Sequence, residues 1–164
     1  MEKRKKMLVK EVMRTGLVTA KESTTLRELM KIFYEFNFHT IPVVKGNNKL
    51  VGIVAMEDIL KIFQPYPPYI SEMLKRTPFL DVYDDIDLLD ADIPPEMGTL
   101  CIVKDLMNEN VVTIDKEATT PEALSLMKMH QLRRLPVIDK EGFLIGIISL
   151  FDIILAVFKE KGVL

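Results

Sequence analysis

Residues 146–152, with the sequence GIISLFD, place a serine and an aspartate three positions apart, directly after a short apolar run. The N-terminus of a helix presents unpaired backbone N–H groups and a partial positive charge, which suits a phosphate. Ser149 could cap such a helix or donate to a phosphate oxygen, and Asp152 could accept hydrogen bonds from two ribose hydroxyls, as acids do in dinucleotide sites. The same spacing is also typical of a plain helix start, with a serine N-cap and an acid in the first turn.

Two arginines precede this motif. Arg133 and Arg134 come directly before the run LPV. Guanidinium groups there could lie near bound phosphates. A solvated basic pair on the surface explains the two arginines equally well, so both interpretations stay open.

An earlier segment repeats the motif with changes. Residues 52–58, GIVAMED, end in Asp58, which could still hold a ribose, but Ala55 stands in place of the serine. A phosphate contact and a helix cap are therefore lost together. His39 and Thr40 replace the two arginines, and His39 could be a phosphate ligand or an ordinary partly buried residue. We expect two sites of unequal affinity, of which the second copy of the motif supplies the better one.

Signals for other chemistries are weak. The two histidines and the single cysteine, Cys101, lie far apart in the sequence and lack metal-ligand spacing, so we expect no metal site. The sequence has no GxSxG, P-loop or GxGxxG motif, and we predict that the chain is not an enzyme. A net charge of -2 does not favour general nucleic-acid binding. We interpret the basic residues 3–6 as a solvated arm, with nucleic-acid or membrane contact as the alternative.

The sequence predicts a cytoplasmic protein without membrane insertion. The basic start is not followed by the apolar segment of a signal peptide. The longest apolar run, residues 144–158, is interrupted by Asp152 and is too short to cross a bilayer. A single cysteine fits a reducing compartment.

The elements that must position these residues are revealed by an internal repeat. Residues 9–63 align without a gap on residues 103–157, at an offset of 94 positions, and 14 of the 55 aligned pairs are identical. Fixed-offset similarity over such a length indicates a duplicated structural unit.

Each copy predicts the same order of elements. An extended run (17–20 or 111–114) precedes a helix that begins with the capping-box spacing of threonine and glutamate. Two apolar runs around a polar turn predict a β-hairpin, and a last helix opens at Ala55 or Ser149. Each copy is thus β-α-β-β-α, and one copy alone buries too little surface to be comfortably stable. The sequence predicts an α+β fold in which the two copies pack sheet against sheet.

The resulting division of the chain has five parts. These are an N-terminal basic arm (1–8), a first repeat (9–63), an insert (64–102), a second repeat (103–158) and a C-terminal tail (159–164). The insert is proline-rich and then acidic, and residues 71–79 could form a short helix. Its clustered aspartates lack the glycine turn and closing glutamate of an EF-hand loop. We interpret the insert as a solvated connector, with docking to a partner as the alternative.

The ordered motifs V-x-(E/D)-h-M, V-T, T-x-x-E, h-P-V-h and G-h-h-(S/T)-x-x-D, found twice, resemble a tandem pair of CBS domains, the family named after cystathionine β-synthase. Only Ala55 departs from the last motif. The resemblance implies that the two repeats pack as one pseudo-twofold module and that two modules form a homodimer. It also implies clefts between the repeats that bind AMP, ADP, ATP or S-adenosylmethionine, with no required cofactor.

The resemblance also implies roles for particular residues. The strand containing Val112, Thr113 and Ile114 would supply backbone groups and an apolar wall for adenine. The full ligand-binding set that it implies is Asp152, Ser149, Arg133, Arg134, Val112, Thr113, Ile114, Pro136, Asp58, Thr19, Ala20, His39 and Thr40. The sequence does not assign each of these residues to one cleft.

Two functions follow as hypotheses. In the first, the chain is a regulatory module that senses an adenosine compound and modulates an unknown partner protein, by favouring one of two states. In the second, the chain is a dimerisation or interaction scaffold with degenerate pockets and no nucleotide ligand. Ala55 and the missing arginines of the first repeat favour the scaffold. An ATP-hydrolysing enzyme is the weakest alternative.

Overall fold

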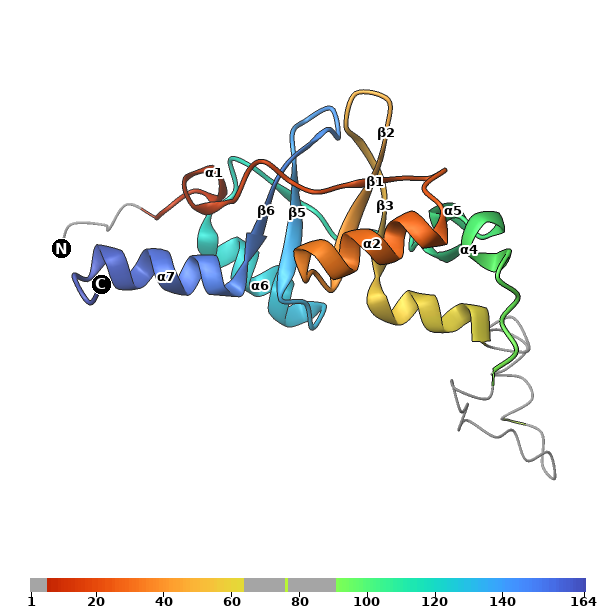
Figure 1. The fold of residues 1–164 in the computed structure, drawn as a ribbon. Helices are drawn as coiled ribbons and strands as arrows, with labels where there is room; N and C mark the ends of the chain where they lie inside the picture. Colours follow the sequence, from red (N-terminus) through yellow and green to blue (C-terminus); the bar gives the residue numbers. More distant parts are fainter. Residues whose placement is uncertain (1–5, 64–75, 77–90) are drawn as a thin grey trace.

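The computed structural model describes residues 6–63, 76 and 91–164, which form two copies of a three-stranded sheet with flanking helices (Figure 1). The first copy contains β1 (Ala20–Lys21), α2 (Leu26–Phe36), β2 (Thr40–Lys45), β3 (Lys49–Ala55) and the 3-10 helix η1 (Met56–Phe63). The second contains β4 (Ile114–Asp115), α6 (Thr120–Met129), β5 (Arg134–Ile138), β6 (Leu144–Ser149) and α7 (Leu150–Glu160). The short helix α1 (Val9–Val12) lies before β1, and α4 (Met97–Leu100) and α5 (Val103–Leu106) lie before β4. The predicted α+β fold with two β-α-β-β-α repeats is confirmed.

The two sheets have the same topology and register. In each, the middle strand pairs in parallel with the first strand and antiparallel with the third, in the orders β1-β2-β3 and β4-β5-β6. Val43 lies opposite Gly52, and Val137 lies opposite Gly146, so the pairing repeats at the offset found in the sequence. The first strands are shorter than the predicted runs 17–20 and 111–114, because the residues before β1 and β4 leave the sheet edge and line clefts instead.

Capping boxes begin three of the helices. Thr25, Thr119 and Ser149 each accept a bond from the backbone N–H three residues later, and the acid at that position accepts the backbone N–H of the cap. Such caps stabilise a helix by about 1 kcal/mol each. The last helix of the first copy instead follows Ala55, which has no hydroxyl, and it is a 3-10 helix. The predicted helix starts are therefore present, and the one substituted start has a different helical geometry.

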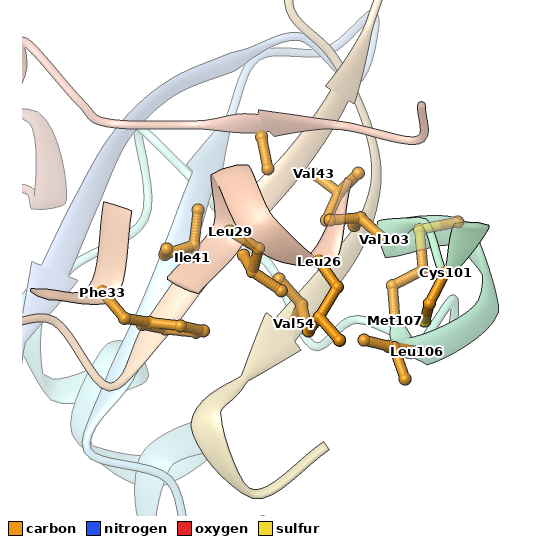
Figure 2. Close-up of a cluster of buried hydrophobic side chains, with 11 residues drawn as sticks. Leu26, Leu29, Phe33, Ile41, Val43, Val54, Cys101, Val103, Leu106 and Met107 are labelled. Atoms are coloured by element: carbon orange, nitrogen blue, oxygen red, sulfur yellow. The ribbon is translucent and has the colours of Figure 1, made fainter. Parts of the chain in front are cut away.

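The first residues of each repeat, which come before its first strand, pack in the core of the other repeat. Val103, Leu106 and Met107 are buried with Leu26 and the other core residues of the first repeat (Figure 2). Reciprocally, Val9 is fully buried in the core of the second repeat, with Leu135, Val137 and Ile148 among others. Figure 1 shows the consequence, since α1 lies near α7 and the chain then crosses to β1 in the other half of the molecule.

Backbone hydrogen bonds fix this exchange in a pseudo-twofold pattern. The Arg14 N–H donates to the Ile147 carbonyl (2.8 Å), and the Ile147 N–H donates back to Arg14 (3.0 Å). Asn108 and Ile53, the equivalent pair, exchange bonds of 2.8 and 2.9 Å. The hairpin turns also meet, because the Leu144 N–H donates to the Asn48 carbonyl at 2.8 Å. The two repeats therefore form one module, as predicted.

Two glycines permit the crossing. A Cβ added to Gly146 would lie 2.6 Å from Met13 Sδ and 2.9 Å from the Arg14 carbonyl oxygen. At Gly52 the equivalent distances are 2.8 Å to Met107 Sδ and 3.1 Å to the Asn108 carbonyl oxygen. Glycine is thus required in both repeats because the other repeat's leading segment passes directly over the strand.

Candidate functional site

Two clefts lie where the repeats meet, and they are related by the pseudo-twofold exchange. The Asp152 cleft, of about 410 Å³, is lined by Arg14, Thr15, Gly16, Leu17, Val18, Phe38, Thr40, Pro42, Arg134, Ile147, Ser149, Phe151 and Asp152. The His39 cleft, of about 580 Å³, is lined by His39, Thr40, Pro42, Ile53, Glu57, Asn108, Asn110, Val111, Val112, His130, Leu132, Arg133, Arg134, Pro136 and Ile147. Four residues, Thr40, Pro42, Arg134 and Ile147, line both clefts and form a shared wall.

Ser149 and Asp152 form the start of α7 in the Asp152 cleft. Ser149 Oγ lies 2.5 Å from Asp152 Oδ2, which also accepts the Ser149 backbone N–H at 3.1 Å. The Asp152 N–H donates to Ser149 Oγ at 3.1 Å, which completes the capping box. The Asp152 side chain is only 7% exposed. Ser149 and Asp152 therefore form a helix cap, and this cap leaves a carboxylate on the wall of a cleft.

Arg14 is a residue of this cleft that the sequence did not single out. Its Nε lies 2.6 Å from Asp152 Oδ1, and its side chain is 64% exposed. Arg14 belongs to the start of the first repeat, before β1, while Asp152 belongs to the second repeat. No local spacing connects the two residues, and only the exchange brings them together.

The backbone of the two predicted arginines lies beside the start of α7. Arg134 pairs with Ser149 across the β5–β6 ladder, and the Arg133 carbonyl accepts the Leu150 N–H at 2.9 Å. Arg134 lines both clefts, whereas Arg133 lines only the His39 cleft. The fold thus places Arg134 on the same wall as Ser149, and directs Arg133 to the neighbouring cleft.

The His39 cleft differs from its counterpart in its polar groups. It contains His39, His130 and Arg133, with Glu57 as its acid. Asp58, the predicted ribose ligand of the first repeat, is outside the lining. Its Oδ2 accepts the Ala55 N–H at 2.7 Å, and its Oδ1 pairs with Lys61 at 2.7 Å. Asp58 is therefore engaged within its own helix.

The remaining predicted residues divide between the clefts and the cores. Val112 and Pro136 line the His39 cleft, and Thr40 lines both. Ala20 and Ile114 are buried in the cores, and Thr19 and Thr113 are partly buried outside the lining of either cleft. The structure therefore separates Val112 from Asp152. Its repeat equivalent, Val18, lies beside Asp152 instead, with Leu17.

Several cleft residues were missed by the sequence reasoning. They are Arg14, Leu17, Val18 and Phe151 in the Asp152 cleft, and Glu57, Asn108, Asn110 and His130 in the His39 cleft. The offset of 94 positions could have identified Val18 as the equivalent of Val112. It could not have identified Arg14, because the equivalent residue in the second repeat is Asn108.

Among the residues that the structure describes, no group of three or more histidine, cysteine, aspartate or glutamate side chains is arranged to hold a metal ion. Within the same ranges, no helix is both long and apolar enough to cross a membrane. The predicted short helix at 71–79 and most of the acidic segment lie outside the described residues.

Comparison with known proteins agrees with the duplicated motifs. The profile of the CBS domain family matches residues 9–65 and 103–159. A CBS domain-containing protein of Dictyostelium discoideum is 30% identical over 149 residues, which cover 91% of this chain and 90% of that protein.

Two solved structures share the fold. CBSX2, a CBS-pair protein of Arabidopsis thaliana, was crystallised in complex with AMP; it is 24% identical, covers 94% of this chain and 98% of its own, and has a TM-score of 0.68. The CBS domain pair of protein MJ0100, in complex with 5-methylthioadenosine and S-adenosyl-L-methionine, is 21% identical, covers 96% and 99%, and has a TM-score of 0.63. At these identities the likeness shows the shared fold.

Proposed function

The chain belongs to the CBS domain family as a tandem pair, and from this premise we propose that it is a non-catalytic regulatory module that binds an adenosine compound between its repeats and thereby modulates a partner protein. AMP, ADP, ATP and S-adenosylmethionine are the candidate ligands. Complexes of two proteins with the same fold, one with AMP and one with 5-methylthioadenosine and S-adenosyl-L-methionine, support this choice.

The observation that carries the proposal is the position of the Asp152 carboxylate. It lies on a cleft wall, at the start of α7, with Ser149 directly beside it. A carboxylate in this place can accept the hydroxyls of a ribose, and the helix start and Ser149 can face a phosphate. Leu17 and Val18 line the same cleft and offer an apolar surface for adenine.

The two clefts are proposed to differ in affinity. The Asp152 cleft has both the carboxylate and the serine hydroxyl, so we expect it to bind more tightly. The equivalent residues of the first repeat, Ala55 and Asp58, do not line the His39 cleft; Ala55 has no hydroxyl, and Asp58 is paired with Lys61. Arg133 still gives that cleft a cation for a phosphate, and the rings of His39 and His130 offer hydrogen-bonding nitrogens beside it.

We further propose that the module forms a homodimer through its helices. Phe151, Ile154 and Phe158 expose 62%, 43% and 45% of their surface and follow one another at helical spacing on α7. Exposed apolar side chains gathered in this way are typical of an interface. Sedimentation velocity would show a dimer; a monomer at all concentrations would contradict it. The division into five parts and the location in the cytoplasm remain predictions.

Calorimetric titration with AMP, ADP, ATP and S-adenosylmethionine tests the binding function. We expect saturable binding of at least one compound and the loss of the tighter binding event in Asp152→Ala. Asp58→Ala is the matched control. Asp58 is the equivalent carboxylate at the start of the last helix in the first repeat, and it does not line the His39 cleft. Circular dichroism checks that each variant is folded. If no compound binds to protein freed of co-purified ligand, the scaffold hypothesis replaces this proposal.

A further inference from the structure

The Asp152 carboxylate is already occupied by groups of the protein itself. Arg14 Nε donates to Oδ1 at 2.6 Å, while Ser149 Oγ and the Ser149 N–H lie 2.5 and 3.1 Å from Oδ2. A carboxylate offers about four acceptor positions, and a vicinal diol brings two O–H donors. Three positions are filled, so a ribose that donates both hydroxyls must displace one present partner.

Arg14 is the partner that can leave. The two donors from Ser149 belong to the cap of α7, and losing them would leave the helix start unpaired. The Arg14 side chain is 64% exposed, so water can rehydrate it after it moves. Its backbone stays fixed by both hydrogen bonds to Ile147, and the freed guanidinium therefore remains tethered at the cleft.

We propose that Arg14 is a selectivity residue of the Asp152 cleft: ligand hydroxyls must displace it from Asp152, and its freed guanidinium then favours ligands that also carry an anionic group. The inference rests on the proposed function and extends it to the chemical class of the ligand. A neutral nucleoside breaks the ion pair without replacing the lost partner. A nucleoside phosphate offers the guanidinium a new anion, to which arginine binds in a planar, two-pronged geometry.

This arrangement belongs to one cleft only. The residue equivalent to Arg14 is Asn108, which carries no charge, and Asp58 is paired instead with Lys61 three residues along its own helix. Arg134 also lines the Asp152 cleft, so the removal of Arg14 leaves one cation in place. Arg134 supplies a positive charge to both clefts, whereas Arg14 adds selectivity for anionic ligands in the Asp152 cleft.

The first test measures the ion pair in the absence of ligand. Urea unfolding of wild type, Arg14→Gln, Asp152→Asn and the double variant forms a double-mutant cycle. We expect the double variant to lose less stability than the sum of the two single losses. Additive losses would show that the Arg14–Asp152 ion pair does not stabilise the protein in solution. This result would overturn the proposal, whether or not nucleotides bind.

The second test compares adenosine with AMP as probes. Only molecules whose carboxylate is free of Arg14 can bind the ribose, and this fraction lowers the apparent affinity; Arg14→Gln should therefore bind adenosine about two- to sixfold more tightly. Its binding of AMP should be unchanged or weaker, so that the preference for AMP over adenosine falls. Arg14→Lys should keep most of that preference. Lys10→Gln, which removes a cation of the same segment from a pair with Glu117, is the control and should leave both affinities unchanged.

The outcomes separate this inference from the proposed function. Unchanged or weaker adenosine binding by Arg14→Gln, in a protein that binds AMP through Asp152, would overturn the selectivity role and leave the proposed function standing. If neither these probes nor ADP, ATP or S-adenosylmethionine binds wild type or Arg14→Gln while the unfolding cycle shows a coupled pair, both the proposed function and this inference fail.

Discussion

Gly146 lies in β6 at the point where Met13 and Arg14 cross the strand, and replacing it with alanine should destabilise the whole module. The new Cβ would lie 2.6 Å from Met13 Sδ and 2.9 Å from the Arg14 carbonyl oxygen. The methionine side chain can move, but the carbonyl oxygen is held by the Ile147 N–H at 3.0 Å. The crossing segment must therefore shift away from the second repeat.

The expected loss can be estimated from two opposing effects. Overpacking of this kind costs about 1–3 kcal/mol. Alanine is otherwise favoured over glycine within a strand by about 0.5–1 kcal/mol. At the midpoints of these ranges Gly146→Ala should lower the free energy of unfolding by about 1 kcal/mol, which corresponds to a fall in Tm of about 2–4 °C for a chain of this size.

Urea unfolding followed by circular dichroism provides the assay. Gly52→Ala, with its nearest atom at 2.8 Å, should show a smaller loss. Gly98→Ala is the control, because its Cβ would meet nothing closer than Arg27 Nε at 3.5 Å, and it should leave stability unchanged or slightly raised. A Gly146→Ala protein as stable as wild type would refute the close crossing of the N-terminal segment over β6.

Two further predictions concern ionisable groups. The pKa values of Glu28 and Glu122 are lowered because the backbone N–H and hydroxyl of Thr25 and Thr119 donate to the two carboxylates. Each ionised carboxylate thus stabilises the fold at pH values above the ordinary glutamate pKa of about 4.3. This contribution is lost as the pH falls through the lowered pKa of the folded protein. The stability difference between wild type and Glu122→Gln, measured by urea unfolding, should therefore narrow on acidification; a constant difference would contradict the cap. Burial raises the pKa of the Cys101 thiol, so iodoacetamide should modify it more slowly in the folded protein than in urea, and equal rates would contradict its burial.

The repeated features of the fold could be predicted from the sequence because they depend on local spacing. The capping boxes at Thr25 and Thr119 require only a hydroxyl and an acid three residues apart. The hairpins follow from two apolar runs around a polar turn, and the offset of 94 positions carries the register from one repeat to the other. The Ser149–Asp152 motif was placed correctly at the start of a helix for the same reason.

The exchange between repeats could not be predicted in this way. An alignment of the two copies shows which residues correspond, but not which copy each residue contacts. Val9 aligns within the first repeat, yet it packs in the core of the second. The separation of Val112 from Asp152 has the same cause, since each leading segment lines the cleft of the other repeat's last helix. Likewise, Arg14 meets Asp152 across 138 positions of sequence, beyond any local pattern.

The Asp152 cleft is proposed to hold an adenosine compound through its ribose. A crystal structure of the protein grown with saturating AMP tests it most directly. We expect AMP in this cleft, with ribose hydroxyls donating to Asp152, adenine beside Leu17 and Val18, and the Arg14 side chain moved away from the carboxylate. An intact Arg14–Asp152 pair with AMP bound elsewhere, or an empty cleft in crystals grown with each of AMP, ADP, ATP and S-adenosylmethionine, would contradict this binding mode.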